Sequence, residues 1–372
     1  MYFHRNGVII FMMFISMKYV KEGMVIGKSL YDDDLKLIIK DGIKLRKNQI
    51  DKIISLGYMG IYIADEQSDE LDIQDIVRED LRNTAFKTVK EIFINKNSEN
   101  DNLDYLPDIS KVNDVISEII EELLSKDVLL IDMMNLKTYD GYTFYHSVNV
   151  AIISLVIGIE LGIEGERLKK LGIGALFHDI GKMFVEVNIL NKKAKLTTEE
   201  FEEIKNHSRY GYEYIKGKLK LDEDIFECIL QHHERYDGTG YPDKLNTEKI
   251  NIFARIIIIC DVYDALVSNR TYREGILPSE AIEYIMANSG IMFDPKIVKA
   301  FIKKVVPFPI GTIVKLSNGL VGIVARNYEQ YGMRPSVKVI RDINNNKIDY
   351  YYINLKDDMN YSNVTIIKIL PF

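Results

Sequence analysis

The spacing of hydrophobic residues divides the chain into a long helical middle and two shorter flanks. Apolar positions recur with a helical period from about residue 71 to about residue 305, with a polar break at 95–108. Short apolar runs with turn signals precede this stretch, and period-two runs separated by tight turns follow it. The pattern predicts a mainly α protein, in which an all-α body carries a small N-terminal α+β module and a small C-terminal antiparallel β-barrel.

The same pattern predicts where the parts begin and end. We expect an apolar N-terminal extension at 1–16, the α+β module at 17–70, a helix and linker at 71–110, the helical domain at 111–305 and the barrel at 306–372. The apolar run at 8–17 is too short for a bilayer, which needs about 20 residues, and no small-residue cleavage site follows it. We therefore interpret 1–16 either as residues added by a start codon assigned too far upstream or as a loose extension, with a membrane anchor as the alternative.

Composition and charge exclude several classes of protein. Of the 372 residues, 47% are apolar and 28% are charged, and the formal net charge is −7. A broad basic surface for a nucleic-acid polymer is therefore not expected. The two cysteines, Cys228 and Cys260, are far apart, which excludes a disulfide scaffold and favours a reducing compartment. We expect a cytoplasmic protein without a stable membrane span.

Histidines and aspartates cluster in the helical region. Five of the six histidines lie between residues 146 and 233, where Asp179 follows His178 and His233 follows His232. Imidazole and carboxylate ligands without thiolates suit Zn, Mn, Fe, Ni or Co. Adjacent residues on a helix diverge by about 100°, so His232 and His233 suit two neighbouring ions better than one. A carboxylate such as Asp179 can bridge a metal pair of this kind.

Five segments, taken in order, resemble an HD-GYP domain. They are HSVNVA from His146, ALFHDIGK at 175–182, His207, HHERYDGTGYP at 232–242 and DVYDALVSNRTYR at 261–273. The resemblance runs from about residue 140 to about residue 305. It implies an all-α HD-superfamily fold and a metal-dependent phosphodiesterase that acts on cyclic di-GMP.

The resemblance also implies roles for single residues. The expected metal ligands are His146, His178, Asp179, His207, His232, His233 and Asp261, with Asp179 bridging. The expected catalytic residues are Asp179, Lys182 and Asp264, where Lys182 faces the scissile phosphate and Asp264 orients the nucleophile or accepts its proton. Substrate contacts are expected from Lys182, Gly240, Tyr241, Pro242 and Arg270. Helical spacing is consistent with two of these pairings, because Asp179 and Lys182, like Asp261 and Asp264, are three residues apart.

Charge suggests how such a site works and how many ions it needs. A phosphodiester is anionic, so hydrolysis needs a nucleophile formed at neutral pH and cations that absorb developing charge, and a metal pair supplies both. Some family members hold a third ion with a glutamate four residues before the first ligand histidine. Tyr142 occupies that position, and a phenol with a pKa near 10 is a poor ligand. We expect two ions, Fe or Mn, and linear pGpG or GMP as product.

Several alternatives stay open at this point. The substrate can be the related cyclic GMP-AMP, the domain can be a cyclic-dinucleotide receptor without turnover, or the enzyme can act on another nucleotide, as elsewhere in the HD superfamily. The flanking modules have the size of interaction modules, which leaves open a homodimer or signalling-protein partners. They can equally serve only to cover apolar surface of the helical body.

Overall fold

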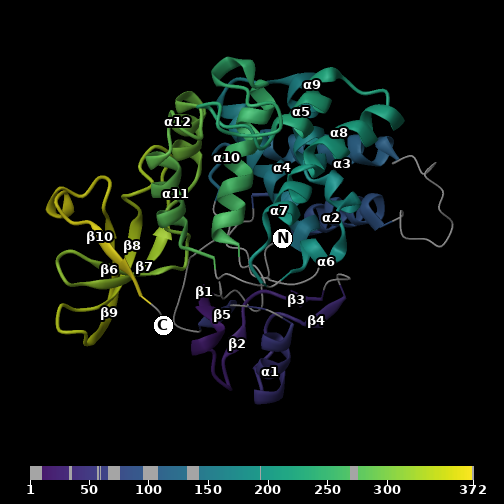
Figure 1. Ribbon diagram of the computed structural model, residues 1–372. Coiled ribbons are helices and arrows are strands. Elements are labelled where there is room, and N and C mark those ends of the chain that lie inside the picture. The colour runs from purple at the N-terminus through teal and green to yellow at the C-terminus, as the bar shows by residue number, and fades with distance from the viewer. Residues whose placement is uncertain are drawn as a thin grey trace.

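A computed structural model describes residues 11–32, 36–56, 58, 60–65, 76–94, 108–131, 142–192, 194–268 and 275–370. Figure 1 shows a helical body with the N-terminal module beneath it and a C-terminal sheet at its side. None of the described helices is both long enough and apolar enough to cross a membrane.

The helical body is built around two helices that are apolar on nearly every side. Its helices are α2 (Glu79–Ile94), α3 (Ile109–Leu124), α4 (Tyr142–Glu160), α5 (Gly165–Phe177), α6 (Val187–Leu190), α7 (Thr198–Lys205), α8 (His207–Lys218), α9 (Glu223–Gln231), α10 (Ile252–Val267), α11 (Pro278–Ala287) and α12 (Pro295–Lys304). The four consecutive isoleucines Ile256–Ile259 of α10 are all buried. A helix without an exposed face must lie inside a bundle, and α10 packs there against α4. The predicted all-α body is confirmed.

Helix α2 packs as part of this body. Leu81, Phe86 and Val89 are buried in the same hydrophobic cluster as the residues of α4 and α10. The ring of Phe86 stacks on Tyr145 of α4, with ring centroids 4.2 Å apart. The segment that the sequence analysis separated as a helix and linker therefore contributes a helix to the core.

The N-terminal flank is an α+β module, as the pattern predicts. Its elements are β1 (Phe11–Ser16), the 3-10 helix η1 (Met17–Tyr19), β2 (Val25–Ile26), β3 (Leu30–Tyr31), β4 (Leu37–Ile39), α1 (Lys47–Ser55) and β5 (Gly60–Asp65). Strand β5 lies between β1 and β2, and β3 pairs with β4.

Strand β1 corrects the expectation for the start of the chain. All six of its residues pair antiparallel with β5, from Phe11 opposite Asp65 to Ser16 opposite Gly60. The side chain of Ile15 is buried. The expectation of a loose extension is therefore wrong for residues 11–16, because their backbone completes a sheet. Residues 8–10 of the apolar run lie outside the described residues.

The C-terminal flank has the five predicted strands but forms no barrel. The strands are β6 (Ile313–Leu316), β7 (Val321–Arg326), β8 (Ser336–Arg341), β9 (Lys347–Asn354) and β10 (Ile366–Ile369), with the short 3-10 helix η5 (Met359–Tyr361) before the last. Their order is β10-β6-β7-β8-β9, and every pair is antiparallel. In the described part of the chain, β9 and β10 are the edges of an open sheet. The predicted barrel is wrong, because the edge strands β9 and β10 do not pair with each other and the sheet stays open.

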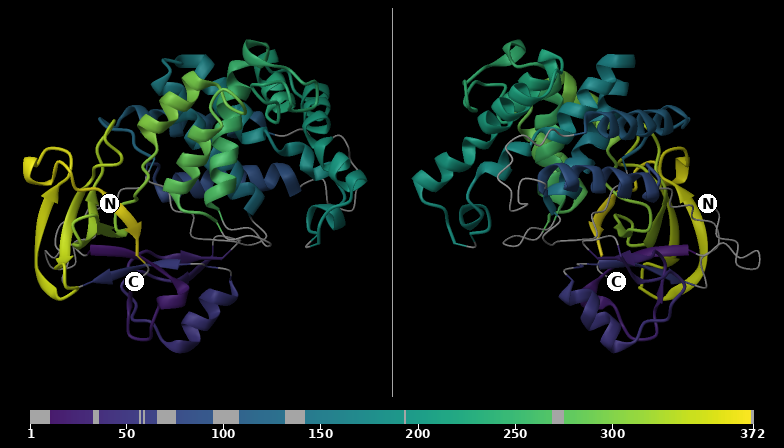
Figure 2. Two further views of the ribbon diagram at one scale, coloured as in Figure 1. Left: turned by 60° about the vertical axis from the view of Figure 1, so that its left-hand side comes forward. Right: turned by 90° about the vertical axis from the view of Figure 1, so that its right-hand side faces the viewer.

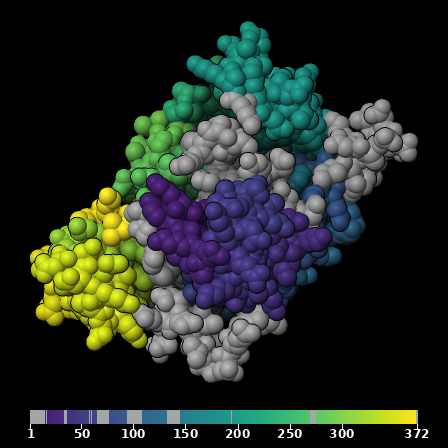
Figure 3. All heavy atoms as spheres, turned by 90° about the horizontal axis from the view of Figure 1, so that it is seen from below, coloured from purple at the N-terminus to yellow at the C-terminus, as the bar shows by residue number. Residues whose placement is uncertain are grey.

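The N-terminal module packs against one face of the C-terminal sheet. Ile313, Val321 and Ile323 belong to the same buried cluster as Ile15 and Ile63 of the N-terminal module. Residues that alternate with them, such as Val314 and Val324, face a second cluster within the C-terminal flank. Figure 2 and Figure 3 show the two flanks side by side. The two ends of the chain therefore form one unit with a common core.

Candidate metal centre

All seven predicted metal ligands lie together in the helical body. They come from α4 (His146), the end of α5 (His178, Asp179), the start of α8 (His207), the end of α9 (His232, His233) and α10 (Asp261). Two groups place their ligand atoms within metal-binding distance of one another. The first ligand group is His146, His178 and Asp179, and the second ligand group is Asp179, His207, His232 and His233. Asp179 belongs to both.

A glycine brings Asp179 close to His207. The 3-10 helix η3 (Ile180–Phe184) follows Asp179 and packs against α8. A Cβ atom at Gly181 would collide with the carbonyl oxygen of His207 and would lie 2.5 Å from the backbone nitrogen of Gly211. Only glycine permits this approach. As a result, Oδ1 of Asp179 lies 3.4 Å from Nε2 of His207.

Three of the histidine rings are oriented by the main chain. In each, Nδ1 lies within hydrogen-bonding distance of the carbonyl oxygen three residues earlier; the pairs are His178–Ala175 at 2.7 Å, His207–Ile204 at 2.6 Å and His232–Ile229 at 2.7 Å. A carbonyl oxygen only accepts, so Nδ1 carries the proton. Each Nε2 atom then keeps its lone pair, which is the arrangement of metal-binding histidines.

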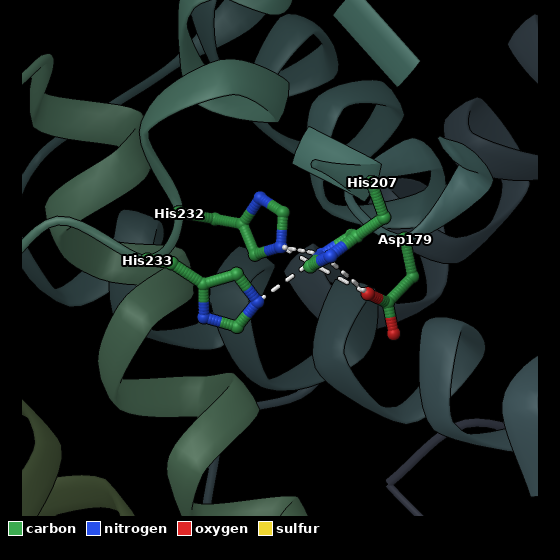
Figure 4. A group of neighbouring side chains, drawn as sticks. All are labelled: Asp179, His207, His232 and His233. Carbon is green, nitrogen blue, oxygen red and sulfur yellow. Dashed lines mark hydrogen bonds and ion pairs between the residues drawn. The ribbon is translucent and has the colours of Figure 1, made fainter. Parts of the chain in front are cut away.

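These lone pairs face one another in the second ligand group (Figure 4). Nε2 of His207 lies 3.1 Å from Nε2 of His232 and 3.2 Å from Nε2 of His233. The lone pairs of His207 and His232 repel at this distance unless a cation lies between them. In the first ligand group, Nε2 of His178 is buried and has no hydrogen-bond partner among the described residues. The side chains therefore fit divalent cations at both groups.

The carboxylate of Asp179 is divided between the groups. Its Oδ1 faces His207, and its Oδ2 lies 3.4 Å from Nε2 of His178 and 3.7 Å from Nε2 of His146. Nζ of Lys182 lies 2.6 Å from the same Oδ2. One oxygen toward each group is the geometry of a bridging carboxylate.

Burial keeps the three histidines of the second ligand group neutral. It lowers the pKa of His207 to about 4, and together with the charge of His207 it lowers the pKa of His233 to about 3. The pKa of His232 also lies well below its usual value, again mainly because of burial. Neutral imidazole is the form that binds metal, so these ligands are ready at pH 7.

The charges of the first ligand group differ. Burial alone would lower the pKa of His146, but hydrogen bonds to Asp261 and Asp264 outweigh it and raise the pKa to about 9. Burial would raise the pKa of Asp179, but Lys182 and the neighbouring imidazoles hold it well below its usual value. This half of the centre therefore carries more carboxylate charge. In the metal-free protein the protonated ring of His146 balances part of that charge.

Asp264 lies behind His146 rather than beside the reacting position. Its Oδ2 lies 2.7 Å from Nδ1 of His146, whereas Oδ1 of Asp261 lies 3.0 Å from Nε2 of the same ring. The imidazole thus separates the two aspartates. Asp264 is buried, and its Oδ1 accepts from Asn149. The resemblance implies that Asp264 contacts the nucleophile directly. The structure disagrees, because the ring of His146 lies between Asp264 and the side of the site where Asp261 lies.

The loop at 232–242 folds against the second ligand group. The Tyr241 ring stacks on His233, with ring centroids 4.8 Å apart, and a cis peptide bond joins it to Pro242. A Cβ atom at Gly240 would collide with the backbone at Glu234 and Arg235. The predicted Gly240, Tyr241 and Pro242 therefore lie beside the centre. The predicted Arg270 lies outside the described residues.

Sequence reasoning missed three residues that shape the site. Glu234 is buried, and its carboxylate accepts from the backbone of Asp243 and Leu245 at 2.7 and 3.0 Å, which orders the loop. Asn149 binds Asp264, and Nζ of Lys205 lies 5.5 Å from the centroid of the Tyr241 ring. Each is an ordinary polar residue of its segment, and only the position of Glu234 directly after His233 offered a signal.

Comparison with known proteins supports the resemblance to an HD domain. A model of the HD domain matches residues 119–297. A cyclic di-GMP phosphodiesterase of Pseudomonas aeruginosa is 37% identical over 232 residues, which are 62% of this chain and 56% of that protein. A cyclic di-GMP phosphodiesterase response regulator of Xanthomonas campestris pv. campestris is 37% identical over 165 residues, 44% of each chain. A 3'3'-cGAMP-specific phosphodiesterase of Vibrio cholerae is 36% identical over 166 residues, 44% of this chain and 37% of that one.

The chain spans about half the length of the first two of these relatives. The part matched by the HD domain model contains the histidine cluster and the loop at 232–242 that folds against it. The matched domain at 119–297 and the motif HHERYDGTGYP at 232–242 make this part of the chain similar to HD domains of the HD-GYP type.

Proposed function

We propose that the protein is a metal-dependent phosphodiesterase that hydrolyses cyclic di-GMP to linear pGpG or GMP. The observation that carries the proposal is the pair of ligand groups that share Asp179. A shared carboxylate between two cation positions is typical of hydrolases that act on phosphodiesters. The relatives named as cyclic di-GMP phosphodiesterases support the choice of substrate.

The ligand sets suggest how two ions would be held. His146, His178, Asp179 and Asp261 would hold one ion, and Asp179, His207, His232 and His233 the other. Fe and Mn suit these nitrogen and oxygen donors. When bound, the metal pair supplies a nucleophile at neutral pH and positive charge at the phosphoryl oxygens.

Three further residues have roles in the proposal. Lys182, whose side chain is 31% exposed beside Asp179, would bind the scissile phosphate and stabilise the charge that develops on it. Tyr241 and the adjacent Gly240 and Pro242 would position the substrate next to His233. Asp264 would act through His146, by holding its ring and its tautomer. Arg270 stays a predicted substrate contact.

A second substrate is supported by one comparison. The relative that is specific for 3'3'-cGAMP shares 36% identity over 166 residues, so a cyclic GMP-AMP is the alternative substrate. A receptor without turnover has less support, since every expected metal-ligand position is filled by a His or Asp. The cytoplasmic location and a homodimer or signalling-protein partner stay predictions.

The test is direct hydrolysis. Metal-free protein is supplied with Mn²⁺ or Fe²⁺ and incubated separately with cyclic di-GMP and with 3'3'-cGAMP, and the products are resolved by chromatography. We expect pGpG or GMP from cyclic di-GMP at a higher rate than products from 3'3'-cGAMP. Tight binding without any product would contradict the proposed enzyme and would indicate a cyclic-dinucleotide receptor.

The number of ions is tested separately. We expect elemental analysis of protein purified without chelator to give close to two metal equivalents per chain. Tyr142 begins helix α4, four residues before His146, so Tyr142→Glu should add a third equivalent if a carboxylate there reaches the centre. Three equivalents in the unmodified protein would contradict the dinuclear proposal.

A further inference from the structure

Four side chains form a continuous hydrogen-bonded chain that ends at the metal centre. Nη2 of Arg82 donates to Oδ1 of Asn149 at 3.0 Å, and Nδ2 of Asn149 donates to Oδ1 of Asp264 at 3.0 Å. Oδ2 of Asp264 lies 2.7 Å from Nδ1 of His146. The chain begins on helix α2, which precedes the part of the sequence that the HD domain model matches.

We propose that Arg82 is a positioning residue of the metal centre, which acts through Asn149 and Asp264 on His146. A guanidinium group only donates hydrogen bonds, so it requires the carbonyl oxygen of the Asn149 amide to face α2. The amide nitrogen must then face Asp264. A carboxylate only accepts, so Asp264 requires a proton on Nδ1 of His146 and leaves the lone pair of Nε2 for the ion.

Burial makes this order of donors and acceptors matter. Asn149, Asp264 and His146 are each at most 2% exposed. If the Asn149 amide turned over, its nitrogen would meet the guanidinium and its oxygen would meet the carboxylate. Both contacts are repulsive in a buried site, where an unpaired polar group costs about 1–3 kcal/mol. The charged donor at Arg82 and the carboxylate of Asp264 therefore favour the same orientation of the amide, and Arg82 adds to its stability.

Core packing fixes the position of Arg82. Its neighbour Leu81 is buried, and one turn further along α2 the ring of Phe86 stacks on Tyr145, which directly precedes His146. Phe93 contacts Phe144 edge-to-face, with ring centroids 5.6 Å apart. The backbone that carries Arg82 is therefore held against the same turn of α4 that carries His146.

The inference rests on the proposed metal centre, so the experiment measures metal binding itself. Metal-free protein is titrated with Mn²⁺ in a calorimeter, and its thermal unfolding is followed in parallel. Three variants are compared with the unmodified chain. Arg82→Met keeps the apolar stem and removes the donors, Arg82→Lys keeps a charged donor, and Lys87→Met is a control at an exposed position of the same helix.

We expect Arg82→Met to weaken one of the two Mn²⁺ equivalents about 10-fold and to leave the other unchanged. Arg82→Lys should regain at least part of that affinity, and Lys87→Met should bind as the unmodified chain does. Unchanged affinity in Arg82→Met, or the same loss in Arg82→Lys as in Arg82→Met, would overturn the inference. Equal weakening of both equivalents together with a lower melting temperature would show a merely structural role and would also overturn it. If the unmodified chain binds no Mn²⁺, the proposed function itself fails, which is a different result.

Discussion

The two ligand groups differ at His146, because His178 of the first group is held by a main-chain carbonyl oxygen, as two histidines of the second group are, whereas His146 is held by a side chain. In the second ligand group, His207 and His232 donate Nδ1–H to main-chain carbonyl oxygens one helical turn earlier. In the first ligand group, His146 donates to the side chain of Asp264, which is itself held by Asn149. A main-chain carbonyl persists under any substitution, whereas a carboxylate can be replaced. The first group is therefore the half of the centre that other side chains can adjust.

The groups also differ in charge. The imidazoles of the second group have lowered pKa values, whereas two carboxylates raise the pKa of His146. Only Asp179 is common to both groups. Substitutions at Asp179 should therefore affect both ions, and substitutions behind His146 should affect one.

The largest effect is expected at the shared ligand. Asp179→Ala should remove both metal equivalents and reduce hydrolysis by at least ~1000-fold, because the charge stabilisation that a metal supplies is worth several kcal/mol. Elemental analysis and initial rates measure the two effects. Retention of one full equivalent would contradict the sharing of Asp179.

The pH dependence of metal-free protein should show the two groups separately. The pKa of His207 is about 4 in the folded protein and about 6.5 when unfolded. Its share of stability is therefore present above pH 6.5 and is lost as the pH falls from 6.5 to 4, which amounts to roughly 3 kcal/mol. The pKa of His146 is about 9, so its share is complete below pH 6.5 and is lost as the pH rises toward 9.

Chemical unfolding in chelator between pH 4.5 and pH 9.5 measures both slopes. His207→Gln should reduce the loss of unfolding free energy as the pH falls below 6.5. His146→Gln should reduce the loss of unfolding free energy as the pH rises toward 9. An acid slope that persists unchanged in His207→Gln would show that other groups cause it.

A smaller effect is expected from substitution of Lys182, whose ammonium group lies beside Asp179. Lys182→Met should lower kcat for cyclic di-GMP about 100-fold, because one donor to the developing phosphoryl charge is lost. Metal content should stay near that of the unmodified protein, and Lys220→Met at an exposed position should change neither quantity. Loss of metal in Lys182→Met would show that Lys182 supports the ligands rather than the phosphate.

The smallest effect should appear behind His146. An amide has one acceptor oxygen, so Asp264→Asn can keep only one of the bonds that the carboxylate makes to His146 and Asn149. We expect one metal equivalent to bind about 10-fold more weakly, with the other unchanged. Calorimetric titration with Mn²⁺ measures this, and equal weakening of both equivalents would erase the distinction between the groups.

The sequence predicted the ligands better than the side chains that hold them. The seven His and Asp residues predicted as ligands stand in recognisable motifs, and the structure brings all seven side chains together. The resemblance assigned Asp264 to the reacting position and helical spacing was consistent with it, but neither reveals that the ring of His146 lies between Asp261 and Asp264. Arg82 and Asn149 could not be found, because their contacts join helices that are distant in sequence.

The flanks show a similar limit. Period-two runs predicted the five C-terminal strands, but alternation does not reveal whether the first and last strands pair. The apolar run at 8–17 was interpreted from its length alone. Its partner β5 lies more than forty residues later, and its core neighbours, such as Ile323, lie at the other end of the chain.

The core shared by the two ends of the chain has a consequence for biosynthesis. Ile15 and Ile63 leave the ribosome before the helical body, whereas Ile313, Val321 and Ile323 leave after it. The N-terminal module is thus synthesised before the helical body, but its core is completed only after the C-terminal strands have been synthesised. During translation its uncovered apolar face is therefore a surface that a chaperone would protect.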